Sequence, residues 1–167
     1  LKYLYIIFFY FCNFTNTSFA HPEKPKVLAM LEGRHWILNT NKFLELGAGT
    51  DDVLIDIARD TQIINYLRFR ALEALSLYPT EKTADFLEDT AKNTISAIAR
   101  RGFEAFRNGF KEIKPKKVKK LAESLLKHHN AYIRISAART LRSMDPNGFK
   151  KFLKSESNAW VRKEVQK

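Results

Sequence analysis

Residues 65–79 recur further along the chain as residues 131–146, and this repetition constrains the fold more than any other feature of the sequence. Tyr66 and Tyr132 are separated by 66 positions, as are Arg68 and Arg134, and 66 is twice 33. A period of about 20–50 residues is typical of repeat proteins, in which each unit is one supersecondary element. The chain is therefore expected to be an array of similar units.

Apolar residues recur at helical spacing beyond residue 27, and no segment alternates with the two-residue period of a strand. Thr50 is predicted to cap one helix, and Pro115 and Pro146 to lie in the first turns of two others. We predict an all-α fold with helices over 27–39, 40–46, from 50, 66–78, 80–91, 93–110, from 115, 131–144, from 146 and 159–165. Connections of about two to six residues make neighbouring helices antiparallel.

The first 20 residues differ from the rest and predict a secretory signal peptide. Lys2 is followed by an apolar core, and Ser18 and Ala20 supply small residues before the expected cleavage point. The core is shorter than the ~20 apolar residues that cross a bilayer. An uncleaved anchor or a buried helix is the alternative, and lipidation of Cys12 is disfavoured by the bulky residues before it. Cleavage would remove the single cysteine.

The rest of the chain is then expected to be periplasmic or secreted, with no membrane span and no disulfide. We assign residues 21–26 to an extended leader rich in proline and charge. Residues 27–167 are assigned to one helical domain.

The repeated stretch resembles the HEAT repeats of the bilin-lyase-like type, in which an Asp or Asn turn leads into a helix reading Val-Arg-x-x-Ala-Ala-x-x-Leu. The best match is Ile133-Arg134-Ile135-Ser136-Ala137-Ala138-Arg139-Thr140-Leu141. Residues 67–75 match with Leu72 in the second alanine position, residues 101–106 are a weaker copy, and the last copy has Glu164 and Val165 in the Ala-Ala positions. The resemblance covers residues from about 40 to 167.

This resemblance implies an α-solenoid of about four antiparallel helix pairs, with inner helices on a concave face. It also implies that Arg68, Arg134 and Arg162 are structural, because the arginine of the motif commonly forms a ladder with aspartates or asparagines of the turns. An irregular helical bundle is the alternative. The small residues of the motif are expected to let paired helices approach closely, whatever the family: Ala71, Ala74, Ala105, Ala137 and Ala138.

The chain contains no pattern typical of a catalytic or metal site. The four histidines have no zinc-binding spacing, and Gly47-Ala48-Gly49 lacks the lysine of a phosphate-binding loop. Asp52, Asp56 and Asp60 share a helix face, but carboxylates on a solvated face are their usual explanation. We therefore predict that the protein is not an enzyme and takes no cofactor or metal.

Positive charge is concentrated in the second half of the chain. Residues 100–167 contain 19 basic and 6 acidic residues, a net of +13, whereas residues 21–99 contain 9 basic and 12 acidic residues, a net of −3. Arginines are expected on the inner helices. Lysines are expected on or beside the outer helices, where they keep the surface soluble.

These observations predict an exported scaffold that binds an acidic protein, or another anionic envelope polymer, through an arginine-rich concave face. The candidate binding residues are Arg107, Arg139, Arg142, Arg100 and Arg101. Reversing the charges of Arg139 and Arg142 is expected to weaken binding without unfolding the protein.

Three other functions are alternatives. Nucleic-acid binding is permitted by the charge, but the leader and an expected lack of aromatic–basic interleaving on the inner helices argue against it. Head-to-tail self-association of the acidic and basic halves is a further alternative. A transferase activity like that of the bilin lyases has no supporting constellation of residues.

Overall fold

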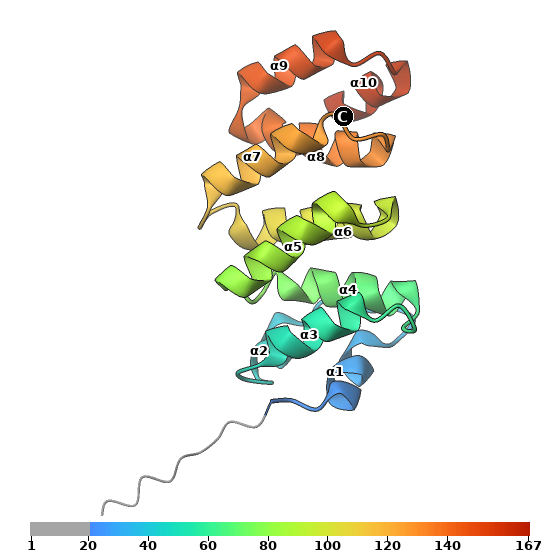
Figure 1. The fold of residues 1–167 in the computed structure, drawn as a ribbon, viewed down its shortest axis with the longest axis vertical. Coiled ribbons are helices and arrows are strands. Elements are labelled where there is room, and N and C mark those ends of the chain that lie inside the picture. Colours follow the sequence, from blue (N-terminus) through green and yellow to red (C-terminus); the bar gives the residue numbers. More distant parts are fainter. Residues whose placement is uncertain (1–20) are drawn as a thin grey trace, which may run out of the picture.

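The computed structural model describes residues 21–167, in which every regular element is an α-helix (Figure 1). The described segment is thus all-α, as predicted. The helices are α1 (Lys24–Leu31), α2 (Thr40–Leu44), α3 (Thr50–Arg59), α4 (Asn65–Leu75), α5 (Glu81–Asn93), α6 (Ser96–Phe110), α7 (Pro115–Leu125), α8 (Ala131–Met144), α9 (Pro146–Ser155) and α10 (Ala159–Gln166).

The helices are stacked along the long axis of the molecule (Figure 1). Four of them form one row, in which α4 packs against α6, α6 against α8, and α8 against α10. We call these the inner helices. The outer helices α3, α5 and α7 each pack against the inner helix that follows, and both α9 and α10 pack against α8. Because short turns join outer to inner helices, the inner helices all begin at the same edge of the stack.

Small residues allow the close packing of this row. The five alanines predicted to do so are all buried: Ala71, Ala74, Ala105, Ala137 and Ala138. The larger side chains of Leu72, Leu75, Phe106 and Leu141 are completely buried between them. Each such side chain contributes about 1.5–3 kcal/mol through burial, so these layers are the main source of stability.

Side-chain caps begin several of the helices. The side-chain oxygen of Thr80 accepts a hydrogen bond from an amide of α5, and Asn130 and Asn158 do the same for α8 and α10. Asp145 caps α9, whose first residue is a proline, as the sequence predicts. Such a cap stabilises a helix by about 1 kcal/mol.

The N-terminal part differs from the sequence-based predictions. Helix α1 begins at Lys24, inside the predicted leader, because Pro25 occupies its first turn, where no amide donor is needed. It ends at Leu31, not near residue 39, since Gly33 adopts a φ of 108° that breaks the helix. Thr50 lies inside α3. The capping position belongs to Gly49, whose φ is 79°.

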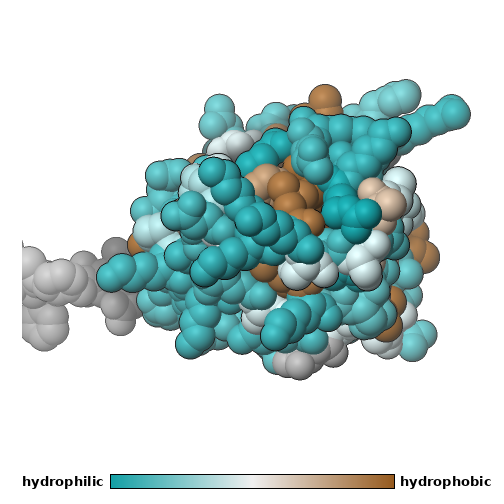
Figure 2. Space-filling view, turned by 90° about the horizontal axis from the view of Figure 1, so that it is seen from above, coloured by the Kyte–Doolittle hydropathy of each residue, from teal (hydrophilic) through white to brown (hydrophobic). Residues whose placement is uncertain are grey.

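The stack ends at α9 and α10. Seen from this end, apolar side chains gather in the middle of the surface and hydrophilic ones surround them (Figure 2). The buried apolar residues of these two helices include Phe149, Phe152, Val161 and Val165. The last helices therefore close the core without a further layer above them in the described residues.

The predicted signal peptide lies outside the described residues. Among residues 21–167, no helix combines the length and the apolar character needed to cross a membrane.

Candidate functional site

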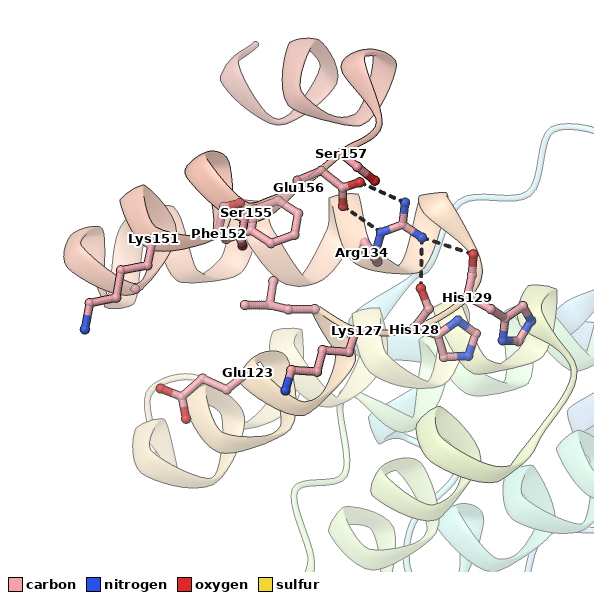
Figure 3. A pocket seen from close by; sticks show the side chains of 12 residues that line it. Glu123, Lys127, His128, His129, Arg134, Lys151, Phe152, Ser155, Glu156 and Ser157 are labelled. Carbon is pink, nitrogen blue, oxygen red and sulfur yellow. Dashed lines mark hydrogen bonds and ion pairs between the residues drawn. The ribbon is translucent and has the colours of Figure 1, made fainter.

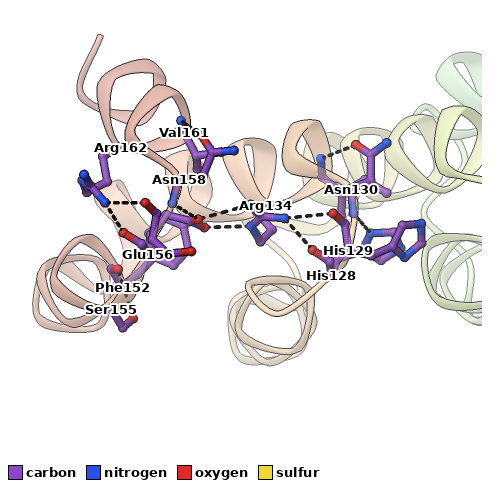
Figure 4. Close-up of polar contacts among 12 residues, drawn as sticks. His128, His129, Asn130, Arg134, Phe152, Ser155, Glu156, Asn158, Val161 and Arg162 are labelled. Carbon is purple, nitrogen blue, oxygen red and sulfur yellow. Dashed lines mark hydrogen bonds and ion pairs between the residues drawn. The ribbon is translucent and has the colours of Figure 1, made fainter.

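Arg134, near the start of α8, is the centre of a polar network at the turns (Figure 4). Its Nε and Nη2 donate hydrogen bonds of 2.7 and 3.2 Å to the two carboxylate oxygens of Glu156. Its Nη1 donates to the carbonyl oxygens of His128 and His129 at 2.9 and 3.0 Å. Glu156 is only 8% exposed, so this pair joins the turn before α8 to the turn before α10.

The equivalent arginines of two other inner helices make similar contacts. Arg162 donates to the carbonyl oxygens of Glu156 and Ser157. Arg68 donates to the carbonyl of Ala58 at 3.0 Å. All three arginines satisfy carbonyl groups at or just beyond the end of the preceding outer helix. These contacts agree with a structural role, but the partners are mainly backbone carbonyls and Glu156; among the described residues, only Arg68 of the three donates to an asparagine, Asn65, at 3.1 Å.

Two of the five predicted binding residues lie in one pocket. Arg107 of α6 and Arg139 of α8 line a hollow of about 480 Å³ together with Lys111. Among the described residues, the Arg107 guanidinium bonds only to the side chain of the adjacent Asn108, at 3.0 and 3.2 Å. Glu112 is the acidic residue of the lining. The pocket therefore has an excess of positive charge, which suits a carboxylate or phosphate group.

Arg139 and Arg142 also hold the end of α10. The Nη2 atom of Arg139 donates to the carbonyl oxygen of Glu164 at 2.7 Å, and Nη1 of Arg142 donates to that of Val165 at 3.0 Å. These carbonyls belong to the last turn, where cations are favoured by the helix dipole. Reversing both charges is now expected to loosen α10, which corrects the earlier expectation of an unaffected fold.

Arg100 and Arg101 do not join this pocket. Arg100 lies over the ring of Tyr132, 5.9 Å from its centroid, and Arg101 lies over the ring of Phe69 at 5.8 Å. Both are also paired with Glu104, at 3.8 and 3.4 Å. The five predicted residues therefore do not form one site. Arg107 and Arg139 line the pocket, Arg142 binds the end of α10, and Arg100 and Arg101 lie around Glu104.

A larger cavity, of about 680 Å³, lies between α7 and α9 (Figure 3). Lys127 and Lys151 line it, and so does the network around Arg134. Burial lowers the pKa of His128, with smaller contributions from His129 and Arg134. Its Nδ1 accepts a hydrogen bond from the backbone amide of Asn130, so this imidazole stabilises the turn before α8. No local pattern in the sequence indicates this cavity, because its lining comes from three separate segments.

Two of the three carboxylates predicted to share a helix face, Asp52 and Asp60, have ordinary structural partners. Asp52 forms an ion pair with Lys82 at 2.5 Å, and Asp60 with Lys24 at 3.0 Å. Within residues 21–167, no group of three or more His, Cys, Asp or Glu side chains is arranged to hold a metal ion.

Aromatic and basic side chains do alternate on the inner helices, contrary to the expectation from the sequence. Arg70 lies 4.9 Å from the ring of Tyr66, and Arg100 approaches Tyr132 as described. Tyr66 and Tyr132 belong to the repeated stretch itself, so their equivalent positions were visible in the sequence. The sequence does not indicate that both side chains are exposed.

Searches against family models, curated proteins and solved structures gave no match to this chain.

Proposed function

We propose that this protein is an exported α-solenoid of about four HEAT-like helix pairs that acts as a scaffold and binds an acidic protein. The row of inner helices and its alanine layers support the solenoid, because each helix contacts mainly its neighbours. The repeated arginine contacts at the turns support the resemblance to HEAT repeats. The predicted signal peptide is the basis for export to the periplasm or the exterior.

The pocket lined by Arg107, Lys111 and Arg139 carries the proposal for binding. The charge of Arg107 is not neutralised by its bonded partner, because the Asn108 side chain is neutral. Among the described residues, Lys111 has no ion pair. Two cations with no acidic partner, on the surface of a half-chain with a net charge of +13, favour a carboxylate-bearing ligand through long-range attraction and direct pairing.

The test is binding to poly-glutamate at moderate salt, compared with single-stranded DNA of similar charge. Arg107→Glu combined with Lys111→Glu is expected to weaken binding of poly-glutamate about ten-fold or more, because both side chains face the pocket and neither holds another helix. The matched control is Lys150→Glu with Lys151→Glu, which makes the same charge change on α9. Equal losses in both variants would show that only net charge matters, and would overturn the site.

Preference for DNA over poly-glutamate at moderate salt would favour the alternative of nucleic-acid binding. Any polycation binds DNA with a steep dependence on salt, so binding at low salt alone is not evidence for a nucleic-acid-binding function. Self-association of the acidic and basic halves is excluded by an unchanged mass between dilute and concentrated samples at low salt.

A further inference from the structure

Three aromatic side chains carry hydrogen-bond donors that the described part of the protein does not use. Residues 21–167 contain three tyrosines and two tryptophans. Trp36 donates from Nε1 to the carbonyl of Met30, and Tyr78 donates from Oη to that of Phe43. The remaining three have no such bond and are 46%, 57% and 43% exposed: Tyr66, Tyr132 and Trp160.

These three residues occupy the same place in three inner helices. Tyr66 is the second residue of α4, Tyr132 of α8 and Trp160 of α10. Ile64 and Ile95 stand at the capping positions of α4 and α6 and are also exposed. Of the eight large exposed apolar residues in the described segment, five are therefore at the edge where the inner helices begin. We call these five residues the aromatic edge.

Helix α6 leaves a hollow in this edge. Its second residue is Ala97, where the other inner helices have an aromatic side chain. A pocket of about 380 Å³ is lined there by Ala97, Arg100, Asn130 and Tyr132. The hollow can receive a small apolar side chain, and Arg100 places a positive charge beside it.

Neighbouring contacts fix the ring of Tyr132, which borders the hollow. The rings of Tyr132 and Trp160 meet edge to face, with centroids 5.3 Å apart and an angle of 75° between their planes. Arg100 lies over the ring of Tyr132. Rings held in this way lose little conformational entropy when a ligand binds, and exposed rows of apolar side chains commonly mark interaction sites.

We propose that the aromatic edge binds an extended, proline-rich and acidic segment of a partner protein in the polyproline II conformation. Packed helices lie about 8–10 Å apart, and a polyproline II chain advances ~9.3 Å in its three-residue turn. The backbone of such a segment therefore advances by about one helix for every three residues, and the rings of Tyr132 and Trp160, which contact each other, form one of the surfaces that it meets. Its unpaired backbone carbonyls accept hydrogen bonds from Tyr66 Oη, Tyr132 Oη and Trp160 Nε1, as in other aromatic grooves that bind proline-rich peptides.

The charges at this edge favour a peptide over a nucleic acid. Arg100 is the cation of the hollow. Its ion pair with Glu104 is long, at 3.8 Å, so a single acidic side chain of the peptide can also pair with it. Arg70, beside Tyr66, already donates to the carbonyls of Leu31 and Gly33. A single-stranded nucleic acid brings a phosphate with every base and needs a groove lined by cations along its length.

This site is separate from the arginine pocket of the proposed function. Arg107 lies in the last turn of α6 and Arg139 in the second half of α8, whereas the aromatic edge is formed by the first turns of the inner helices. Failure of one site to bind does not imply failure of the other.

The experiment is calorimetric titration of the full chain with an acetylated peptide of about ten residues that repeats Pro-Pro-Glu and spans ~30 Å. Saturable binding is expected. Tyr132→Ala and Trp160→Ala should each weaken it about ten-fold or more, in the manner of interface hot spots. Tyr132→Phe keeps the ring and removes only the donor, so a smaller loss is expected. The control is Ile113→Ala, which removes an apolar side chain of similar exposure outside the aromatic edge.

Four results would overturn the proposal. One is the absence of saturable binding, and another is an equal loss in Ile113→Ala. A third is equal affinity for a flexible Gly-Gly-Glu peptide of the same length, which would remove the role of the polyproline II conformation. The fourth is tighter binding of an oligothymidine, which would assign the edge to single strands. Melting followed by circular dichroism confirms that each variant is folded, and Arg107→Glu with Lys111→Glu should leave binding of the Pro-Pro-Glu peptide within about two-fold.

Discussion

At the scale of single residues, arginine has several different roles in this protein. Arg134 joins two turns through a buried carboxylate, and Arg142 donates to the carbonyl of Val165 in α10. Among the described residues, Arg107 bonds only to its neighbour Asn108. The residue type is the same in each case, but its use depends on which acceptor the fold places within reach. An arginine with no acidic or cross-helix acceptor is the most readily available to a partner.

The Arg134–Glu156 pair makes the stability of the fold depend on pH. The hydrogen bonds from Arg134 hold the pKa of Glu156 below its ordinary value; burial opposes this shift and the amide of Asn158 supports it. A carboxyl whose pKa is lowered by folding stabilises the protein above the unfolded value of about 4.3. That contribution is lost as the pH falls through the lower, folded value.

We predict that Glu156→Gln lowers the free energy of unfolding at pH 7 by about 2 kcal/mol, because the partly buried Arg134 loses its charged partner. The difference from the wild type should shrink towards pH 3, because the contribution of the lowered Glu156 pKa is lost as the pH falls from the unfolded value through the folded one. Urea unfolding at both pH values measures this. Glu73→Gln, at an exposed carboxylate without an ion pair in the described residues, is the control. A difference that stays constant from pH 7 to pH 3 would contradict the prediction.

At the scale of helices, close approach between neighbours depends on glycine as well as alanine. Gly109 lies in the last turn of α6, and a Cβ atom added there would be 2.7 Å from the carbonyl oxygen of Ser76. That oxygen belongs to the backbone just after α4, so the contact cannot be relieved by rotating a side chain. Gly109 therefore sets the distance between α4 and α6.

We predict that Gly109→Ala destabilises the protein by about 1–3 kcal/mol through this clash. Alanine is the better helix former by about 1 kcal/mol, so helix propensity alone predicts the opposite sign. Thermal melting distinguishes the two, with the exposed Lys111→Ala as the neighbouring control. A higher melting temperature for Gly109→Ala would show that α4 and α6 can separate at little cost.

At the scale of the whole molecule, the contacts run from each helix to its neighbours along the stack. In such an array stability is close to a sum of local terms, and one end can open while the other stays folded. The proposed solenoid can be tested on this basis, because an irregular bundle around one shared core would respond as a unit.

We predict that Val161→Ala, in the buried face of α10, reduces amide protection against hydrogen exchange mainly in α8, α9 and α10. The amides of α3 and α4 should keep their protection, since they do not contact α10. Hydrogen exchange followed by mass spectrometry of peptides gives the result for each helix. The mirror variant Leu54→Ala, buried in α3, should have its effect at the other end. Equal loss of protection throughout the chain would favour a single cooperative bundle.

Local sequence patterns are sufficient to predict the helical fold, most helix ends and a structural role for the repeated arginines, but not the Glu156 partner of Arg134, which lies 22 residues away. Asn130 and Asn158 accept hydrogen bonds from the first turns of α8 and α10, and Arg134 and Arg162 donate to carbonyls of the turns that precede these helices. Each of these hydrogen bonds joins residues at most six positions apart. Local patterns report such contacts directly. The left-handed Gly49 cap was missed because Thr50, next to it, is also a good capping residue.

The tertiary structure is needed to know which cations are available to bind a partner and which apolar side chains are exposed. Arg139 and Arg142 were chosen from the sequence as binding residues, but the end of α10, more than 20 residues further on, supplies acceptors for both. Tyr132 and Trp160 have the same spacing as core residues, and their exposure follows from how the inner helices are turned against one another. Side-chain partners and exposure depend on segments far apart in the chain, and a local pattern does not contain that information.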